Sequence, residues 1–117
     1  MGRLTTHVLD TAHGRPGAGI TLALYRLDGQ QRQLLCQRLT NADGRCEPAL
    51  LEGAALLAGT YELDFDLGAY FRGLGADLPE PPFLGIVTLR FGVADASSHY
   101  HVPLLATPWS YSTYRGS

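Results

Sequence analysis

The stretch Tyr61-Glu62-Leu63-Asp64-Phe65-Asp66-Leu67 alternates apolar and acidic side chains without a break. Successive side chains of a β-strand point to opposite faces of its sheet, so this pattern predicts a strand with one buried and one solvated face. The same period of two recurs from Ile20 to Leu24 and from Val87 to Val93. The hydrophobic pattern therefore predicts an all-β protein.

Turn signals separate these apolar runs at the intervals expected between short strands. Gly14-Arg15-Pro16-Gly17 and Asn41-Ala42-Asp43-Gly44 are the clearest of them. Many short strands at such spacing predict a two-sheet β-sandwich, here of about eight strands. One short helix is expected near Ala69 to Leu74. The expected strands cover 4–10, 19–27, 33–40, 60–67, 84–93, 99–106 and 109–115, with a further short one near 48–52.

Length and composition describe a single globular domain over residues 1–117, with 45% hydrophobic and 17% charged residues. A formal net charge of -2 gives no reason to expect nucleic acid or a membrane surface as a partner. No apolar run reaches the roughly 18 residues of a membrane span, and the first residues lack the pattern of a secretory signal. A cytoplasmic protein is expected. Cys36 and Cys46 could pair across a strand and the following turn, but that compartment favours reduced thiols.

Two predicted strands carry histidines on their polar faces. Alternation places His99, His101 and Pro103 on one face of their strand, and Thr5 and His7 on one face of theirs. If the apolar faces pack into the sandwich, the histidines project outward. Pro103 has no N–H to donate to a ladder, so its strand is expected to be a weakened sheet edge. On pattern alone, a strand histidine is more often a solvated side chain than a functional one.

Two further stretches carry polar groups that can bind a ligand. Arg45 follows the turn Asn41-Ala42-Asp43-Gly44, in which Gly44 supplies a positive φ. Without further context Arg45 is a solvated turn residue. The sequence ends in Tyr114-Arg115-Gly116-Ser117, which combines a guanidinium, a glycine that permits close approach, and a hydroxyl. These groups are suited to holding a small polar molecule.

A zinc site is one alternative for the histidines, because His7, His99 and His101 offer three imidazoles. The cysteines, however, are not spaced as ligands, and a His-Xaa-His pair alone is a weak signal for zinc. We therefore expect neither a metal ion nor a cofactor.

The sequence resembles the 5-hydroxyisourate hydrolases, the enzyme branch of the transthyretin family, over essentially its whole length. The blocks that carry the resemblance are Leu4 to Pro16, Asn41 to Cys46, Tyr61 to Phe71 and His99 to Ser117. The final Tyr-Arg-Gly-Ser separates these hydrolases from transthyretin proper. The resemblance implies a transthyretin-like sandwich of eight strands and one short helix. It also implies a homotetramer, a dimer of dimers, with active sites in a central channel.

The activity that the resemblance implies is cofactor-free hydrolysis of 5-hydroxyisourate to 2-oxo-4-hydroxy-4-carboxy-5-ureidoimidazoline, in the degradation of urate to allantoin. His101 is expected to act as the base and His7 to orient water or share the proton, with their order left open. Arg45 is expected to stabilise charge on the carbonyl oxygen. Arg115 either touches substrate or anchors the tail by an ion pair. The implied site residues are His7, Arg45, His101, Tyr114, Arg115, Gly116 and Ser117.

Two other functions are compatible with the same fold. The first is a transthyretin-type carrier that binds an apolar or aromatic ligand in the channel without chemistry. Two histidines and an arginine argue against it, because such a ligand favours apolar walls. The second is a sandwich used only for adhesion or interaction, in which the polar tail has no role.

Overall fold

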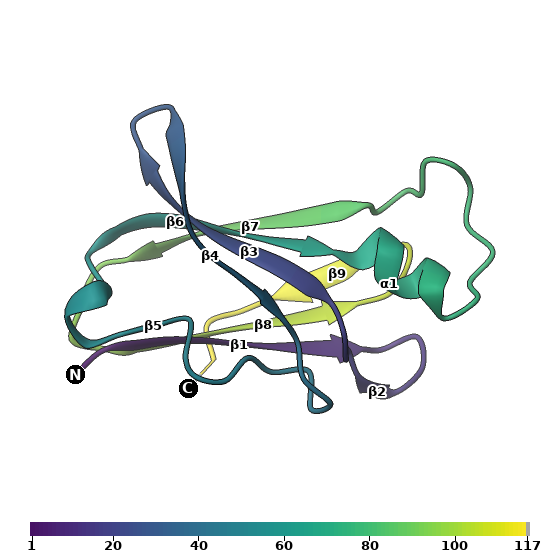
Figure 1. The fold of residues 1–117 in the computed structure, drawn as a ribbon, viewed down its shortest axis with the longest axis horizontal. Helices are drawn as coiled ribbons and strands as arrows, with labels where there is room; N and C mark the ends of the chain where they lie inside the picture. Colours follow the sequence, from purple (N-terminus) through teal and green to yellow (C-terminus); the bar gives the residue numbers. More distant parts are fainter. Residues whose placement is uncertain (117) are drawn as a thin grey trace.

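The computed structural model describes residues 1–116 and contains nine strands, one α-helix and one short 3₁₀ helix within them (Figure 1). The helices are η1 (Gly53–Ala55) and α1 (Leu67–Gly73). Neither of these two helices has the length and apolarity needed to cross a bilayer. The strands are β1 (Arg3–Asp10), β2 (Arg15–Pro16), β3 (Thr21–Asp28), β4 (Gln31–Leu39), β5 (Leu51–Glu52), β6 (Gly59–Asp66), β7 (Ile86–Val93), β8 (His99–Ala106) and β9 (Tyr111–Thr113).

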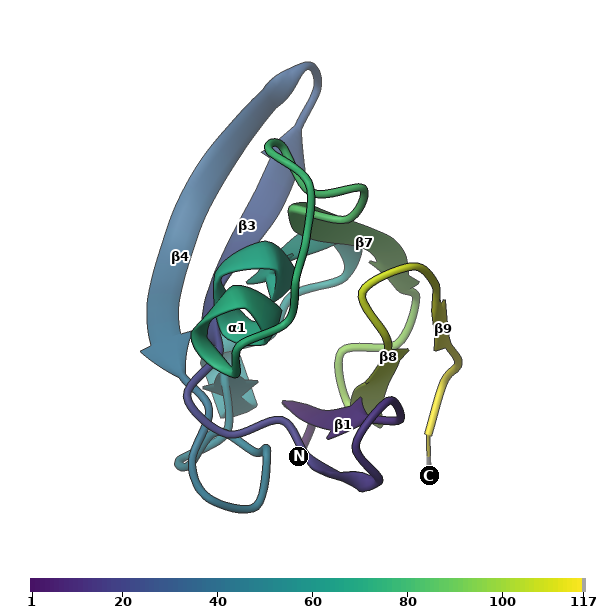
Figure 2. The same cartoon turned by 90° about the vertical axis from the view of Figure 1, so that its right-hand side faces the viewer.

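The strands form two sheets that face each other, as the end view in Figure 2 shows. One sheet has the order β2-β1-β8-β9, with β5 also paired to β1, and the other has the order β4-β3-β6-β7. The β1–β8 pair is parallel, although these strands come from opposite ends of the sequence. The predicted two-sheet sandwich with one short helix is confirmed.

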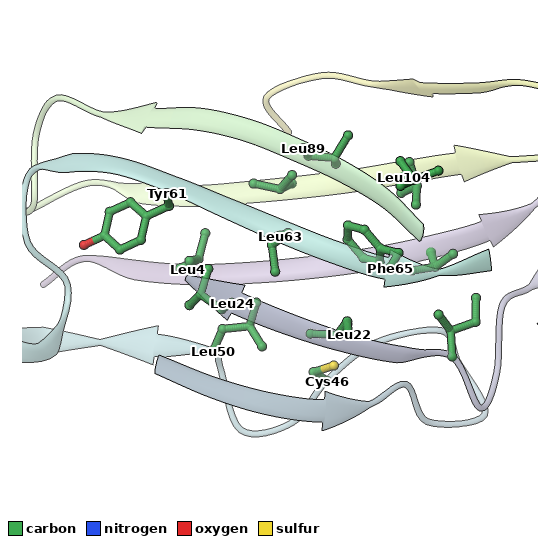
Figure 3. Packing of buried hydrophobic residues seen from close by; sticks show 14 of the residues in the cluster. Leu4, Leu22, Leu24, Cys46, Leu50, Tyr61, Leu63, Phe65, Leu89 and Leu104 are labelled. Carbon is green, nitrogen blue, oxygen red and sulfur yellow. The ribbon is translucent and has the colours of Figure 1, made fainter. Parts of the chain in front are cut away.

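Apolar side chains from both sheets fill the space between them (Figure 3). The alternation in β6 leaves Tyr61, Leu63 and Phe65 without exposed surface, and Leu4 and Leu104 of the opposite sheet are buried to the same degree. Each such side chain stabilises the fold by about 1.5–3 kcal/mol relative to an exposed position. The side chains that face the space between the two sheets are therefore the apolar ones that the alternating pattern predicted to be buried.

Element ends differ from the prediction where side chains hydrogen-bond to nearby backbone. The helix begins at Leu67, which was expected to end a strand, because the Asp66 carboxylate accepts a hydrogen bond from the Ala69 N–H at 3.2 Å. The last strand begins at Tyr111 rather than at residue 109. There the Thr107 hydroxyl accepts hydrogen bonds from the Trp109 and Ser110 N–H groups, which folds this segment into a turn.

The prediction that Pro103 marks a sheet edge is wrong, because β8 lies between β1 and β9. Backbone groups of alternate residues point to the same neighbouring strand, so Pro103 and His101 both face the β9 side. On that side the ladder ends at the Leu104–Thr113 pair. The Pro103 nitrogen therefore falls where no strand hydrogen bond is made, while its carbonyl accepts one from the Thr113 hydroxyl at 2.7 Å.

A buried carboxylate joins the end of β1 to α1. Asp10 accepts hydrogen bonds from the Tyr70 hydroxyl at 2.8 Å and from His13 Nδ1 at 2.7 Å. Burial alone would raise the pKa of Asp10, but the hydrogen bonds from Tyr70 and His13 outweigh it and lower that pKa below its usual value. His13 is stacked on Phe71, so it belongs to this structural cluster.

Candidate active site

The outward faces of β1 and β8 bring histidines from both ends of the sequence together. The parallel register pairs Thr5 with His101 and His7 with Pro103. As a result, the ring centroids of His7 and His101 lie 6.5 Å apart, and those of His99 and His101 lie 6.4 Å apart. His7 and His101 are both half-buried.

The turn that carries Arg45 is attached to β1 next to His7. The Asn41 side-chain oxygen accepts hydrogen bonds from the backbone N–H groups of Asp43 and Arg45, at 2.9 and 3.1 Å. Gly44 has a φ of 75°, and its carbonyl accepts a hydrogen bond from the Val8 N–H at 2.8 Å. A Cβ at position 44 would collide with the Val8 carbonyl. Glycine therefore allows the close approach that places Arg45 in an antiparallel bridge with His7.

The surroundings lower the pKa of both histidines. Burial lowers the pKa of His7, and the Arg45 cation lowers it further, against a hydrogen bond to the Asp43 backbone that raises it. The pKa of His101 is lowered by burial first, then by Arg45, His7 and His99. An imidazole with a lowered pKa is unprotonated near neutral pH and is able to accept a proton.

Replacing Arg45 by glutamine should raise the pKa of both His7 and His101. The guanidinium disfavours the imidazolium form, so its removal makes protonation easier and moves both titrations to higher pH. Burial remains in the variant, which keeps the pKa of each ring below its ordinary value. An NMR titration of the histidine ring protons measures both values. Unchanged titration curves would contradict this electrostatic role for Arg45.

The tail runs along β8 and contacts it through alternate carbonyls. The Gly116 N–H donates to the His101 carbonyl at 2.7 Å, and the Arg115 guanidinium donates to the His99 carbonyl at 3.2 Å. That guanidinium also lies 4.1 Å from the centroid of the Tyr100 ring, on the face of β8 opposite to the histidines. Within residues 1–116 Arg115 therefore has the contacts of an anchor.

Gly116 packs directly against the His101 ring. A Cβ at this position would lie 2.6 Å from His101 Cδ2, closer than real contacts allow. We expect Gly116→Ala to rotate the His101 ring or lift the tail from β8. Changed His101 ring signals in NMR spectra would verify this, with Gly73→Ala as the control because a Cβ there has open space. If the His101 signals stay as in the parent protein, the close packing is not present in solution.

An open pocket of about 540 Å³ lies beside these residues. Arg45 and His101 line it, together with Thr5 and His99. His7 lies at its side through the bridge to Arg45. The rest of its wall comes from Arg3, Thr6, Cys46, Glu47, Pro48, Ala49 and Glu52.

Most of the residues predicted from the sequence come together here, but not all of them. His7, Arg45, His101 and Gly116 converge, whereas Arg115 turns to the other face of β8. The exposed Tyr114 lines a separate hollow with Arg115. The expectation for Ser117 lies outside the described residues. Among residues 1–116, no three histidine, cysteine or acidic side chains are grouped closely enough to hold a metal ion.

Thr5 and His99 were not predicted as site residues. The alternating pattern had placed both on the polar faces of their strands, which was the signal available. Their contact depends on the parallel register of β1 and β8, which lies outside any local pattern.

A two-sheet sandwich that places two histidines of lowered pKa and a cation beside one polar pocket is equipped for acid–base chemistry. A family model described as the HIUase/Transthyretin family matches residues 4–116. The chain belongs to this family.

Named relatives cover the whole chain. The 5-hydroxyisourate hydrolase of Ralstonia nicotianae is 63% identical over 117 residues, which is 100% of each chain. The structure of Klebsiella pneumoniae 5-hydroxyisourate hydrolase aligns with a TM-score of 0.82 at 35% identity, again over 100% of both chains. Sea bream transthyretin in complex with thyroxine aligns with a TM-score of 0.87 at 25% identity, over 97% of this chain and 94% of the other.

Proposed function

We propose that the protein hydrolyses 5-hydroxyisourate to 2-oxo-4-hydroxy-4-carboxy-5-ureidoimidazoline, in the degradation of urate to allantoin. The observation that carries this proposal is the convergence of His7, Arg45 and His101 beside one pocket. Full-length relatives named as 5-hydroxyisourate hydrolases support the choice of substrate. The reaction as proposed needs no metal ion and no cofactor.

In the proposed mechanism, a water molecule attacks the carbonyl carbon of the six-membered ring. His101 takes one proton from this water as the new C–O bond forms, and His7 orients the water or shares the proton. Arg45 stabilises the negative charge that develops on the carbonyl oxygen. The ring C–N bond then breaks, and the imidazolium returns its proton to the departing nitrogen. All atoms of water are thereby accounted for in the product.

The tail completes the proposed substrate site. Gly116 lies against the His101 ring, and we propose that Gly116 and Ser117 close one wall of the pocket around bound substrate. For Arg115, the contacts with Tyr100 and the His99 carbonyl support anchoring of this wall rather than a contact with substrate.

Ultraviolet decay of freshly generated 5-hydroxyisourate, with and without the protein, tests the proposed function. We expect acceleration by the protein that persists after dialysis against a strong chelator. The competing carrier function predicts no acceleration, together with binding of an apolar aromatic ligand such as the thyroxine held by sea bream transthyretin. Acceleration lost on chelation and restored by zinc would contradict the metal-free mechanism.

We also propose a homotetramer, with a mass near four times the 12.6 kDa of one chain. β9 is an edge strand, and the large side chains of Phe83, Ile86 and Trp109 are each more than half exposed. Unpaired strand edges and exposed apolar side chains can be covered by a second copy in a symmetric assembly. Light scattering measures the mass directly. A monomeric mass with full turnover would refute a site that depends on assembly.

The cytoplasmic location stays a prediction.

A further inference from the structure

Thr5 lies between two histidines of β8 and contacts both of them. Its Oγ1 atom is 2.8 Å from His101 Nδ1 and 2.9 Å from His99 Nε2. The parallel register sets Thr5 opposite His101 and Arg3 opposite His99. The Thr5 hydroxyl therefore lies beside His99 and His101, which point to the same face of β8. The three side chains form a continuous hydrogen-bonded chain along one wall of the pocket.

A threonine hydroxyl has one proton to donate and two lone pairs, whereas a neutral imidazole has one N–H and one free nitrogen. If His101 Nδ1–H donates to Thr5, the hydroxyl donates to His99 Nε2, and His101 Nε2 is left unprotonated. In the opposite direction His99 donates to Thr5, Thr5 donates to His101 Nδ1, and His101 carries its proton on Nε2. Of these two directions, only the first leaves His101 with a nitrogen outside this chain that can accept a proton.

We propose that Thr5 is a positioning residue that, together with His99, keeps the proton of neutral His101 on Nδ1 and leaves Nε2 free. This inference rests on the proposed hydrolase function, in which His101 takes a proton from water. The Nδ1 proton stays in place throughout the reaction. The imidazolium formed after proton transfer donates a stronger, charge-assisted bond to Thr5, so the chain also stabilises the charged intermediate.

The surroundings of His101 favour the neutral ring, the form in which the position of its one proton matters. His7 and Arg45 act on the ring from β1 and the turn after β4, and His99 acts on it from β8. Arg3, Glu47 and Glu52 line the same pocket. Burial lowers the pKa of His101, and Arg45, His7 and His99 lower it further. The ring is therefore neutral near pH 7, where its tautomer decides whether Nε2 can act as a base.

The tautomer can be measured directly in free protein labelled with ¹⁵N-histidine. Long-range ¹H–¹⁵N correlation spectra distinguish a protonated from an unprotonated ring nitrogen. In the parent protein we expect His101 to be protonated on Nδ1. In Thr5→Val, which keeps the branched shape but lacks the hydroxyl, we expect the proton to move largely to Nε2. Thr5→Ser should restore the parent pattern.

Kinetics provide the second measurement. Because loss of orientation of a catalytic group can cost up to about 100-fold, we expect Thr5→Val to lower kcat by about 10- to 100-fold with a smaller change in KM. Thr5→Ser should recover most of kcat. Thr88→Val is the matched control, since it removes a hydroxyl bonded to Asp64 on the opposite sheet.

The outcomes of these experiments distinguish failure of the proposed hydrolase function from failure of the proposed positioning role of Thr5. If the parent protein does not accelerate decay of 5-hydroxyisourate, the hydrolase function fails. If it does, and Thr5→Val keeps both the His101 tautomer and kcat, the positioning role is overturned. A lower kcat with an unchanged tautomer also overturns it, because Thr5 would then act through substrate. A parent His101 protonated on Nε2 refutes the proposed direction of the chain.

Discussion

Replacing His101 by asparagine is expected to lower kcat by about 100- to 10,000-fold, the range contributed by a positioned general base. Asparagine keeps a polar group of similar reach but cannot take a proton from water. The fold should persist, because the side chain lies on the outward face of β8 and outside the buried cluster. The backbone carbonyl at this position still accepts the Gly116 N–H. Steady-state kinetics and thermal unfolding measure the two effects separately.

His13→Asn is the matched control for this experiment. His13 donates to the buried Asp10 and is stacked on Phe71, away from the pocket. Its loss should cost about 1 kcal/mol of stability while turnover per folded molecule is retained. We therefore expect His101→Asn to lose turnover and keep stability, and His13→Asn to lose some stability and keep turnover. Comparable losses of turnover in both would show that histidine substitutions act through the fold, and the assignment of His101 as the base would fail.

Removing residues 114–117 is expected to lower kcat/KM by at least about 100-fold, because displacement of substrate by 1 Å already has such an effect. The deletion removes the Gly116 contact with His101 and the Arg115 contacts with Tyr100 and the His99 carbonyl. Little apolar burial is lost, since Tyr114 is 61% exposed. We expect stability to fall by only about 1–2 kcal/mol.

Arg115→Gln tests which part of the tail matters. This variant loses the contact with the Tyr100 ring but keeps the backbone bond between Gly116 and His101, so it should retain more activity than the deletion. Light scattering on each variant shows whether the assembly is kept. Normal hydrolysis by the shortened protein would exclude the tail from the site.

The parts of the fold that follow from local patterns were predictable. Alternation in Tyr61 to Leu67 identified the strand and its buried face, because side-chain direction in a strand depends only on position. The end of that strand was placed one residue too far, since the Asp66 cap depends on a specific hydrogen bond. The Thr107 turn before β9 was missed for the same reason. Such contacts involve single side chains and leave no period in the sequence.

The members of the candidate site were predictable only in part, since Thr5 and His99 were missed, and the connections between them were not predictable. The position of Arg45 beside His7 depends on the close approach of Gly44 to Val8, which the turn sequence permits but does not require. The Thr5–His101 contact joins residues 96 positions apart. A pairing of that kind is set by the packing of the whole sandwich, so no window of sequence contains it. The general rule for proline in strands failed at Pro103 because the ladder is interrupted beside it.

The parallel pairing of β1 with β8 has a consequence for how the molecule is made. Strands β3, β4, β6 and β7 pair within 21–93, so their sheet can assemble as soon as that segment has left the ribosome. β1 emerges first but must wait for β8, and closure of so long a loop is a slow step. We expect the sheet that carries the histidines to be the last to form, so nascent chains would be compact before they are able to turn over substrate.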